Sequence, residues 1–295
     1  MHQPHRQLFP ALAACAGYTI WGFSYLFIRV ALCYADPNVM LATRFVLAFL
    51  LINIPLLTGH ETISLKGKPL KPLILFSLME PLYFFAESYA VLHTNATYTG
   101  VVLAVSPIFS IALAAVLLKE LPTRRQFLFC LLPIAGVIIM TVSGSSLGIL
   151  TPLGGFWLAA TCLVSAMMRT LNRMSSQSYS SFERTYFIML AGAITFPISA
   201  LISTRGQLSA FTEPLSQLPF ILSIITLSVF CSVAANLLVN YAAGEMSVTK
   251  FSSFGTITTV CSTFSGVLLL GEPMTAAALV GAIFIIIGIR QVSKP

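Results

Sequence analysis

The sequence predicts an all-α integral membrane protein with ten transmembrane helices. Of its 295 residues, 57% are hydrophobic and only 8% are charged, whereas a soluble domain carries roughly 25% charged residues. The apolar residues also form long unbroken runs, which suit helices that cross a bilayer better than the alternating strands of an outer-membrane barrel. We therefore expect lipid to cover most of the protein surface.

Ten apolar stretches are long enough to cross a membrane, and short connecting segments separate them. They cover residues 8–34, 38–58, 70–92, 95–118, 126–143, 152–172, 183–203, 218–241, 248–270 and 274–291. The short connections leave no room for a soluble catalytic domain. The six cysteines lie in separate apolar runs, so we expect them to pack as small apolar side chains.

The basic residues predict how these spans are oriented. If the N-terminus is cytoplasmic and the spans alternate, only Arg29, Arg44 and Arg205 among the 16 lysines and arginines fall in the outer half. Basic residues concentrate on the cytoplasmic side of membrane proteins. Both termini are therefore expected in the cytoplasm, and the net charge of +7 is explained without a nucleic-acid partner.

A short motif occurs twice along the chain. The first copy comprises Leu118-Lys119-Glu120, Thr123 and Gly136, and the second comprises Leu270-Gly271-Glu272, Thr275 and Gly288. The repeat divides the chain into two five-span halves, residues 1–146 and 147–295. Since five is odd, the halves have opposite orientations, and such inverted repeats around a central site are typical of secondary transporters.

Several segments carry a resemblance to a known family. WGFSYLFIRVAL, ATRFVLAFLLI, SPIFSIALAAVLLKE and LLLGEPMTAAALVGAIFIIIGI resemble the drug/metabolite transporter superfamily, in particular its EamA-type ten-span carriers. The chain departs from the family pattern with Thr259 where the first half has Pro107, and with LKE in the first copy of the motif. The resemblance implies ten helices around a central cavity, the plasma membrane (the bacterial inner membrane) as location, and export of small metabolites, often amino acids.

The third span places two carboxyl groups and two aromatic rings on one helical face. Glu80, Tyr83, Phe84 and Glu87 follow the spacing i, i+3, i+4, i+7, which forms a single stripe. Pro81 permits a kink beside Glu80. Charged groups at membrane depth are costly and usually face a partner or a cavity, so this stripe predicts a site for an amine or a proton-carrying pair. The alternative is a structural ion pair with arginines.

Three other spans supply further candidates for substrate binding. Tyr18, Trp21 and Tyr25 form an aromatic stripe on the first span, and Trp21 lies too deep for an interfacial belt. Asn236 is the favoured cavity residue of a polar stripe on the eighth span, because its amide both donates and accepts. Thr258 is the candidate on the ninth span. For all of them, packing between helices is the alternative.

Arg44, on the second span, is expected to pair with Glu87 at membrane depth, and contact with a substrate carboxylate is the alternative. Walker, GxGxxG and HExxH motifs are not evident in the sequence, so we expect neither a cofactor nor a metal. The only acidic pair, Glu80 and Glu87, has no nucleophile beside it, which argues against an enzyme.

The sequence thus predicts a secondary active transporter that exports or exchanges small amphipathic metabolites by alternating access. Amino acids, organic amines and zwitterions such as S-adenosylmethionine fit the polar stripes. Transport would be driven by the substrate gradient or by protons. A gradient-driven facilitator or channel is the second hypothesis. The expected partners are a small-molecule substrate and the lipid bilayer, with the protein a monomer or a weak homodimer.

Overall fold

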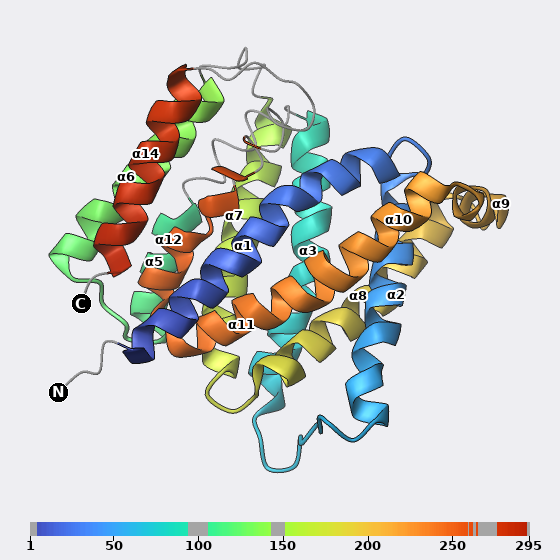
Figure 1. The fold of residues 1–295 in the computed structure, drawn as a ribbon, viewed down its shortest axis with the longest axis horizontal. Coiled ribbons are helices and arrows are strands. Elements are labelled where there is room, and N and C mark those ends of the chain that lie inside the picture. The colour runs from blue at the N-terminus through green and yellow to red at the C-terminus, as the bar shows by residue number, and fades with distance from the viewer. Residues whose placement is uncertain are drawn as a thin grey trace.

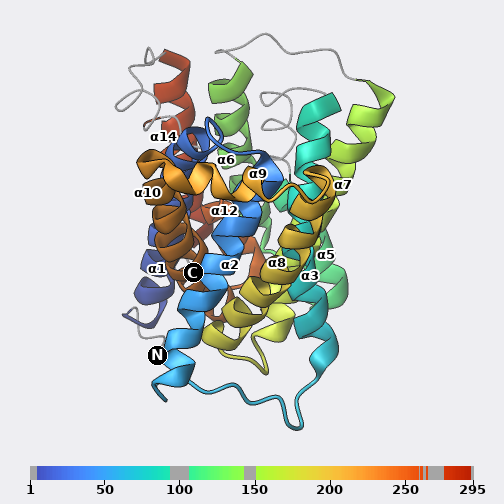
Figure 2. The same ribbon diagram turned by 90° about the vertical axis from the view of Figure 1, so that its right-hand side faces the viewer.

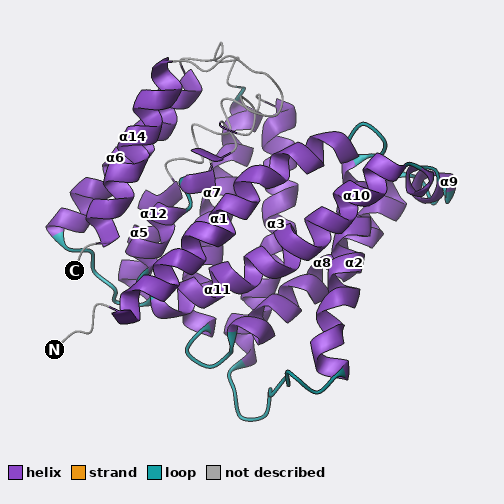
Figure 3. Cartoon of the chain, in the orientation of Figure 1, coloured by secondary structure: helices purple, strands orange, loops and turns teal. Residues whose placement is uncertain are grey.

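The computed structural model describes residues 5–93, 106–142, 151–258, 260, 261, 264 and 276–293. Within these ranges the chain forms helices and no strands (Figure 3). The helices are α1 (His5–Ala31), α2 (Pro37–Leu57), α3 (Leu70–His93), α5 (Ser106–Leu117), α6 (Arg124–Val142), α7 (Pro152–Ser175), α8 (Ser181–Ser203), α9 (Ser209–Thr212), η1 (Pro214–Ser216), α10 (Leu218–Thr226), η2 (Leu227–Ala234), α11 (Ala235–Glu245), α12 (Val248–Phe254) and α14 (Ala276–Ser293).

Length and apolar composition suit several of these helices to a bilayer. Among the described residues, five helical stretches meet both requirements: Leu8–Ile28, Pro37–Leu57, Pro152–Ser175, Ser181–Ser203 and Leu218–Glu245. The last stretch joins α10, the π-helical segment η2 and α11 into one continuous span. The predicted all-helical class is therefore confirmed.

The long helices run up and down in one bundle (Figures 1 and 2). We call the end that carries loops 58–69 and 176–180 the basal end, and the opposite end the apical end. Figure 2 shows α2 and α8 side by side, with α2 ending at one basal loop and α8 beginning at the other. Loop 118–123 belongs to the basal end too, because Glu120 contacts Arg173 near the end of α7.

Local signals in the sequence explain where helices begin. Asp36 caps α2 by accepting a hydrogen bond from the backbone N–H of Asn38 at 2.9 Å, and Pro37 follows at the first helical position. Ser180 and Glu183 form a reciprocal capping box at the start of α8. Each device satisfies backbone N–H groups that the first helical turn leaves unpaired.

Helices from the two halves of the chain pack against one another in pairs. The most extensive pairs are α6 with α14, α3 with α7, α2 with α8, and α1 with α11. Gly136 and Gly288 explain the first pair, because a Cβ on Gly136 would lie 2.8 Å from Ile285 Cγ1 and one on Gly288 would overlap Pro133. These two glycines of the repeated motif therefore let α6 and α14 approach closely (Figure 1).

The predicted span boundaries agree with the helices that can be compared. The stretches 38–58, 70–92 and 152–172 lie within three residues of α2, α3 and α7 at both ends. Three other predictions fall partly outside the described residues. They are 95–105 of the fourth span, most of 259–270 of the ninth span, and Leu270, Gly271, Glu272 and Thr275 of the second motif copy.

Candidate functional site

A cavity of about 330 Å³ lies inside the bundle. Its wall includes residues of α1, α2, α3 and α5 from the first half and of α7, α11 and α12 from the second half. Nine candidates named from the sequence border it: Tyr18, Trp21, Arg44, Glu80, Tyr83, Phe84, Glu87, Asn236 and Thr258. The tenth, Tyr25, belongs to α1, but its side chain lies outside what the structure describes. A cavity of this volume suits a small metabolite.

Helix α3 supplies the acidic and aromatic wall. Tyr83 donates a hydrogen bond from its hydroxyl to Glu87 Oε1 at 2.8 Å. Phe84 meets Phe45 and Phe196 edge-on, with ring centroids 6.1 and 5.8 Å apart. The helical stripe thus presents a fixed Tyr83–Glu87 pair and a rigid aromatic ring, while Glu80 borders the same cavity half-buried.

Arg44 lies next to the acidic wall but does not form the ion pair expected from the sequence. Its Nε donates to Ser232 Oγ at 2.8 Å, and the side chain is only 5% exposed. The carboxyl group that interacts electrostatically with Arg44 is Glu80. Glu87, also a described side chain, bonds to Tyr83 instead. The hydroxyl of Ser232 directs Arg44 toward η2, which explains the difference.

Helix α1 supplies the aromatic wall on the other side. Trp21 Nε1 donates to the carbonyl of Cys231 at 2.8 Å, within the π-helical segment η2. Tyr18 lies edge-on to Trp21 at 5.4 Å and contacts Phe251 at 5.8 Å. π-Helical turns often mark functional positions, and here one supplies the carbonyl that fixes the indole ring.

The polar stripe of the eighth span has two separate roles. Asn236 Nδ2 donates to the carbonyl of Ser232 at 2.8 Å, and the residue borders the cavity. Asn240 instead accepts from Asn172 Nδ2 at 2.8 Å and donates to Thr185 Oγ1 at 2.8 Å. Asn240 borders the cavity as well, so toward the basal end the stripe combines cavity lining with interhelical bonding.

Thr258 has its hydroxyl occupied by the backbone. Its Oγ1 donates to the carbonyl of Tyr18 at 3.2 Å. Gly22 allows this approach, because a Cβ there would lie 2.9 Å from the carbonyl oxygen of Thr258 and would overlap Cys261. Thr258 therefore holds the wall of the cavity against α1.

Arg169 is a cavity residue that the sequence analysis missed. Its place near the end of the predicted span 152–172 puts it among the basic residues of the cytoplasmic side, yet in the structure it borders the cavity from α7. Its Nη1 donates to Ser106 Oγ at 2.9 Å and to Ser110 Oγ at 3.2 Å. An arginine three residues inside the predicted span 152–172 was the available signal, because intramembrane cations usually face a cavity.

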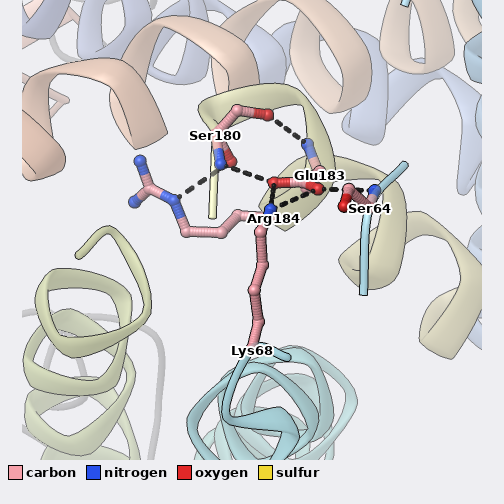
Figure 4. Close-up of polar contacts among 5 residues, drawn as sticks. All are labelled: Ser64, Lys68, Ser180, Glu183 and Arg184. Carbon is pink, nitrogen blue, oxygen red and sulfur yellow. Dashed lines mark hydrogen bonds and ion pairs between the residues drawn. The ribbon is translucent and has the colours of Figure 1, made fainter. Parts of the chain in front are cut away.

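Polar contacts join loop 58–69, which precedes α3, to the start of α8 at the basal end (Figure 4). Glu183 accepts from Lys68 Nζ at 2.9 Å and from the backbone N–H of Ser64 at 2.9 Å. The same carboxylate closes the capping box with Ser180. Arg184, the next residue, donates from Nε to the carbonyl of Ser180 at 3.3 Å.

A second basal group of contacts joins loop 118–123 to α7, α11 and α12, and we call it the Glu120 latch. Glu120 accepts from Arg173 Nε at 3.0 Å and from the backbone N–H of Val248 at 2.9 Å. Arg173 Nη1 also donates to the carbonyl of Gly244. Beside the latch, Arg184 donates to the carbonyl of Asn240 at 2.6 Å. These bonds cross-link the helix ends on the basal side of the cavity.

The sequence as a whole matches known transporters. The model of the EamA-like transporter family matches residues 8–142 and 152–293. The uncharacterized transporter YcxC of Bacillus subtilis (strain 168) is 30% identical over 289 residues, which are 97% of this chain and 93% of that protein. The uncharacterized inner membrane transporter YedA of Escherichia coli (strain K12) is 27% identical, over 92% of this chain and 86% of that protein.

A solved structure supports the likeness at the level of the fold. One crystal structure, at 16% sequence identity, matches with a TM-score of 0.79 and covers 96% of this chain and 95% of that chain. Two matches to one family model together span most of the sequence, which confirms the family expected from the motifs. The protein is therefore a membrane-embedded transporter, not an enzyme, and it belongs to the EamA-like transporter family.

Proposed function

We propose that the protein is a secondary carrier that exports or exchanges small amphipathic metabolites across the plasma membrane. Amino acids, organic amines and zwitterions such as S-adenosylmethionine are the substrate classes that fit best. The observation that carries this proposal is the cavity, which combines carboxyl groups, arginines and aromatic rings inside an apolar bundle. Polar and charged groups at membrane depth usually mark a substrate or ion pathway.

The proposed architecture is ten spans in two inverted repeats, residues 1–146 and 147–295. The family model matches once in each half, which supports a duplication. The packing also has the pattern of a two-fold relation, because α1 contacts α11 as α7 contacts α3, and α1 contacts α12 as α7 contacts α5. Positive charges in the basal loops favour the basal end as the cytoplasmic one, with both termini there.

Amine recognition is assigned to the acidic and aromatic wall. A protonated amine can lie between Glu80 and Glu87 and over the faces of Phe84 and Trp21, where ring quadrupoles attract cations. The positive charge of Arg44 interacts electrostatically with Glu80. When the amine leaves, a proton on Glu80 can replace the lost positive charge, which would couple substrate movement to proton movement.

Alternating access is assigned to the basal contacts. The Glu120 latch and the Lys68–Glu183 ion pair tie helix ends together on one side of the cavity. Each of these two groups of contacts connects residues of the first half of the chain to residues of the second half. Breaking the contacts therefore requires the two halves to move relative to each other. We propose that they close the cytoplasmic side and break when the cavity opens inward.

The test uses Glu80→Gln in vesicles that contain a pH-sensitive dye. Candidate amines and amino acids are added, and substrate-induced proton movement is recorded. Gln keeps the size and the hydrogen-bonding end of the side chain but cannot carry a proton, so proton movement should be abolished. The exposed Glu213 provides the matched control, Glu213→Gln, which should behave as wild type. Proton movement at the wild-type rate in Glu80→Gln would remove Glu80 from the coupling mechanism.

A further inference from the structure

Arg169 differs from the other charged groups at the cavity in its partners. Arg44 interacts with Glu80, and Glu87 accepts the Tyr83 hydroxyl. In the described part of the chain, the side chains that bond Arg169 carry neutral hydroxyls, which include Ser106 and Ser110. A guanidinium at membrane depth usually has an anionic or carbonyl partner. The guanidinium of Arg169 can therefore bind an anionic group of a ligand, because no anionic partner is supplied by the residues that the structure describes.

Ser252 provides a second, independent observation beside this cation. Its side chain is fully buried and borders the cavity from α12. The hydroxyl oxygen has no hydrogen-bond partner among the described residues. Buried hydroxyls are nearly always bonded, because desolvation without a partner costs free energy. A ligand that enters the cavity can provide the missing acceptor for Ser252.

Gly255 lets the end of α12, the helix that carries Ser252, approach Arg169 closely. A Cβ built on Gly255 would lie 3.7 Å from Arg169 Nη2 and 3.3 Å from the carbonyl oxygen of Ser252. Tyr18 Cε1 is also 3.7 Å from that point, and its hydroxyl interacts with Arg169. The absent side chain of Gly255 keeps this corner of the cavity open beside the guanidinium.

We propose that Arg169 and Ser252 form a carboxylate-binding corner of the cavity, separate from the acidic wall on α3. The substrate is then a zwitterion, with its carboxylate on Arg169 and its amine at Glu80 and Glu87. This inference rests on the proposed carrier function and narrows its substrates, because an amine without a carboxylate fills only one of the two sites. Guanidinium binds carboxylate through two parallel hydrogen bonds, and the Ser252 hydroxyl can donate a third.

The experiment measures binding to the purified full-length protein by calorimetry. The ligands are L-phenylalanine, L-leucine and L-methionine, each compared with the amine that lacks its carboxylate. Arg169→Gln should weaken amino-acid binding by roughly 30-fold or more, since it removes one partner of a buried charge pair. The affinity for the amines should change little in this variant. Arg169→Lys keeps the positive charge but loses the paired N–H donors of the guanidinium. Its affinity for amino acids should therefore fall between those of wild type and Arg169→Gln.

Ser252→Ala separates binding from folding. Because its hydroxyl bonds no described residue, the variant should melt no lower than wild type. It should still weaken amino-acid binding by about tenfold, the effect of one hydrogen bond to a charged group. Arg290 is exposed on α14, and Arg290→Gln is the matched control that should leave every affinity unchanged.

Two results would overturn the inference. In the first, the amines bind as tightly as the amino acids, and Arg169→Gln changes neither affinity. That result would be compatible with an amine carrier but would exclude the carboxylate-binding corner. In the second, neither member of any pair binds to wild-type protein, so that this ligand chemistry is wrong. Proton movement in vesicles, which depends on Glu80, then decides separately whether the carrier function also fails.

Discussion

Breaking the Glu120 latch should open the basal side of the cavity in graded steps. Glu120 accepts two hydrogen bonds, one from Arg173 and one from the backbone N–H of Val248. The paired side chains keep 24% and 26% of their surface exposed, so we assign each bond about 1 kcal/mol, below the range for fully buried charged groups. Glu120→Gln can keep the bond to Val248 and should lose only the ion pair.

Those energies translate into changes in the population of the open state. Loss of about 1 kcal/mol raises the open fraction roughly fivefold, and loss of about 2 kcal/mol in Glu120→Ala raises it about 30-fold. Ala243 is 1% exposed and lies beside the latch on α11. A cysteine at this position is therefore a suitable reporter of basal opening.

The assay measures how fast a membrane-impermeant maleimide modifies Ala243→Cys from the basal side, in a background without native cysteines. Labelling should be slowest with Glu120 intact, faster with Glu120→Gln and fastest with Glu120→Ala. The exposed Glu213 again supplies the control substitution to Gln. Equal labelling rates in all three backgrounds, with a lower melting temperature alone, would show that the latch stabilises the fold without gating the cavity.

Two further predictions concern the repeated motif. Lys119 has a backbone φ of +56°, where the second copy of the motif has Gly271. A left-handed conformation costs an L-residue about 1–2 kcal/mol, and the conformational entropy of glycine offsets part of the relief that glycine brings. Lys119→Gly should therefore raise the free energy of unfolding by about 0.5–1 kcal/mol in denaturant titrations. A decrease would contradict this reasoning. Gly288 packs against Pro133 of α6, so Gly288→Leu should destabilise the protein by about 1–3 kcal/mol or more; an unchanged melting temperature would show that α6 and α14 separate freely.

The helices and much of the cavity wall could be predicted from the sequence, because both follow local rules. Apolar runs located α2, α3 and α7 to within three residues. The spacing of Glu80, Tyr83, Phe84 and Glu87 placed them on one face of α3, and all four border the cavity. The period of the helix and the cost of polar groups in lipid are sufficient to predict both features.

The partners of these residues could not be predicted in the same way. Arg44 and Glu87 lie at similar depth in the sequence-based arrangement, but in the structure Arg44 donates to Ser232 and interacts electrostatically with Glu80. Arg169 counted toward the cytoplasmic charge because depth alone does not show which way a side chain points. The Glu120 latch joins residues more than 50 positions apart, and no local pattern specifies such a contact.

The most direct test of the account asks whether the cavity opens to one side at a time. Ile28 borders the cavity from the apical part of α1, and Ala243 lies on α11 beside the Glu120 latch at the basal end of the bundle. Single cysteines at these positions are labelled from either side of sealed vesicles, with and without a gradient of a transported substrate. We expect the two labelling rates to change in opposite directions. Conditions that increase the labelling of Ile28→Cys should decrease the labelling of Ala243→Cys. Two positions that remain accessible together under every condition would contradict alternating access and indicate a channel.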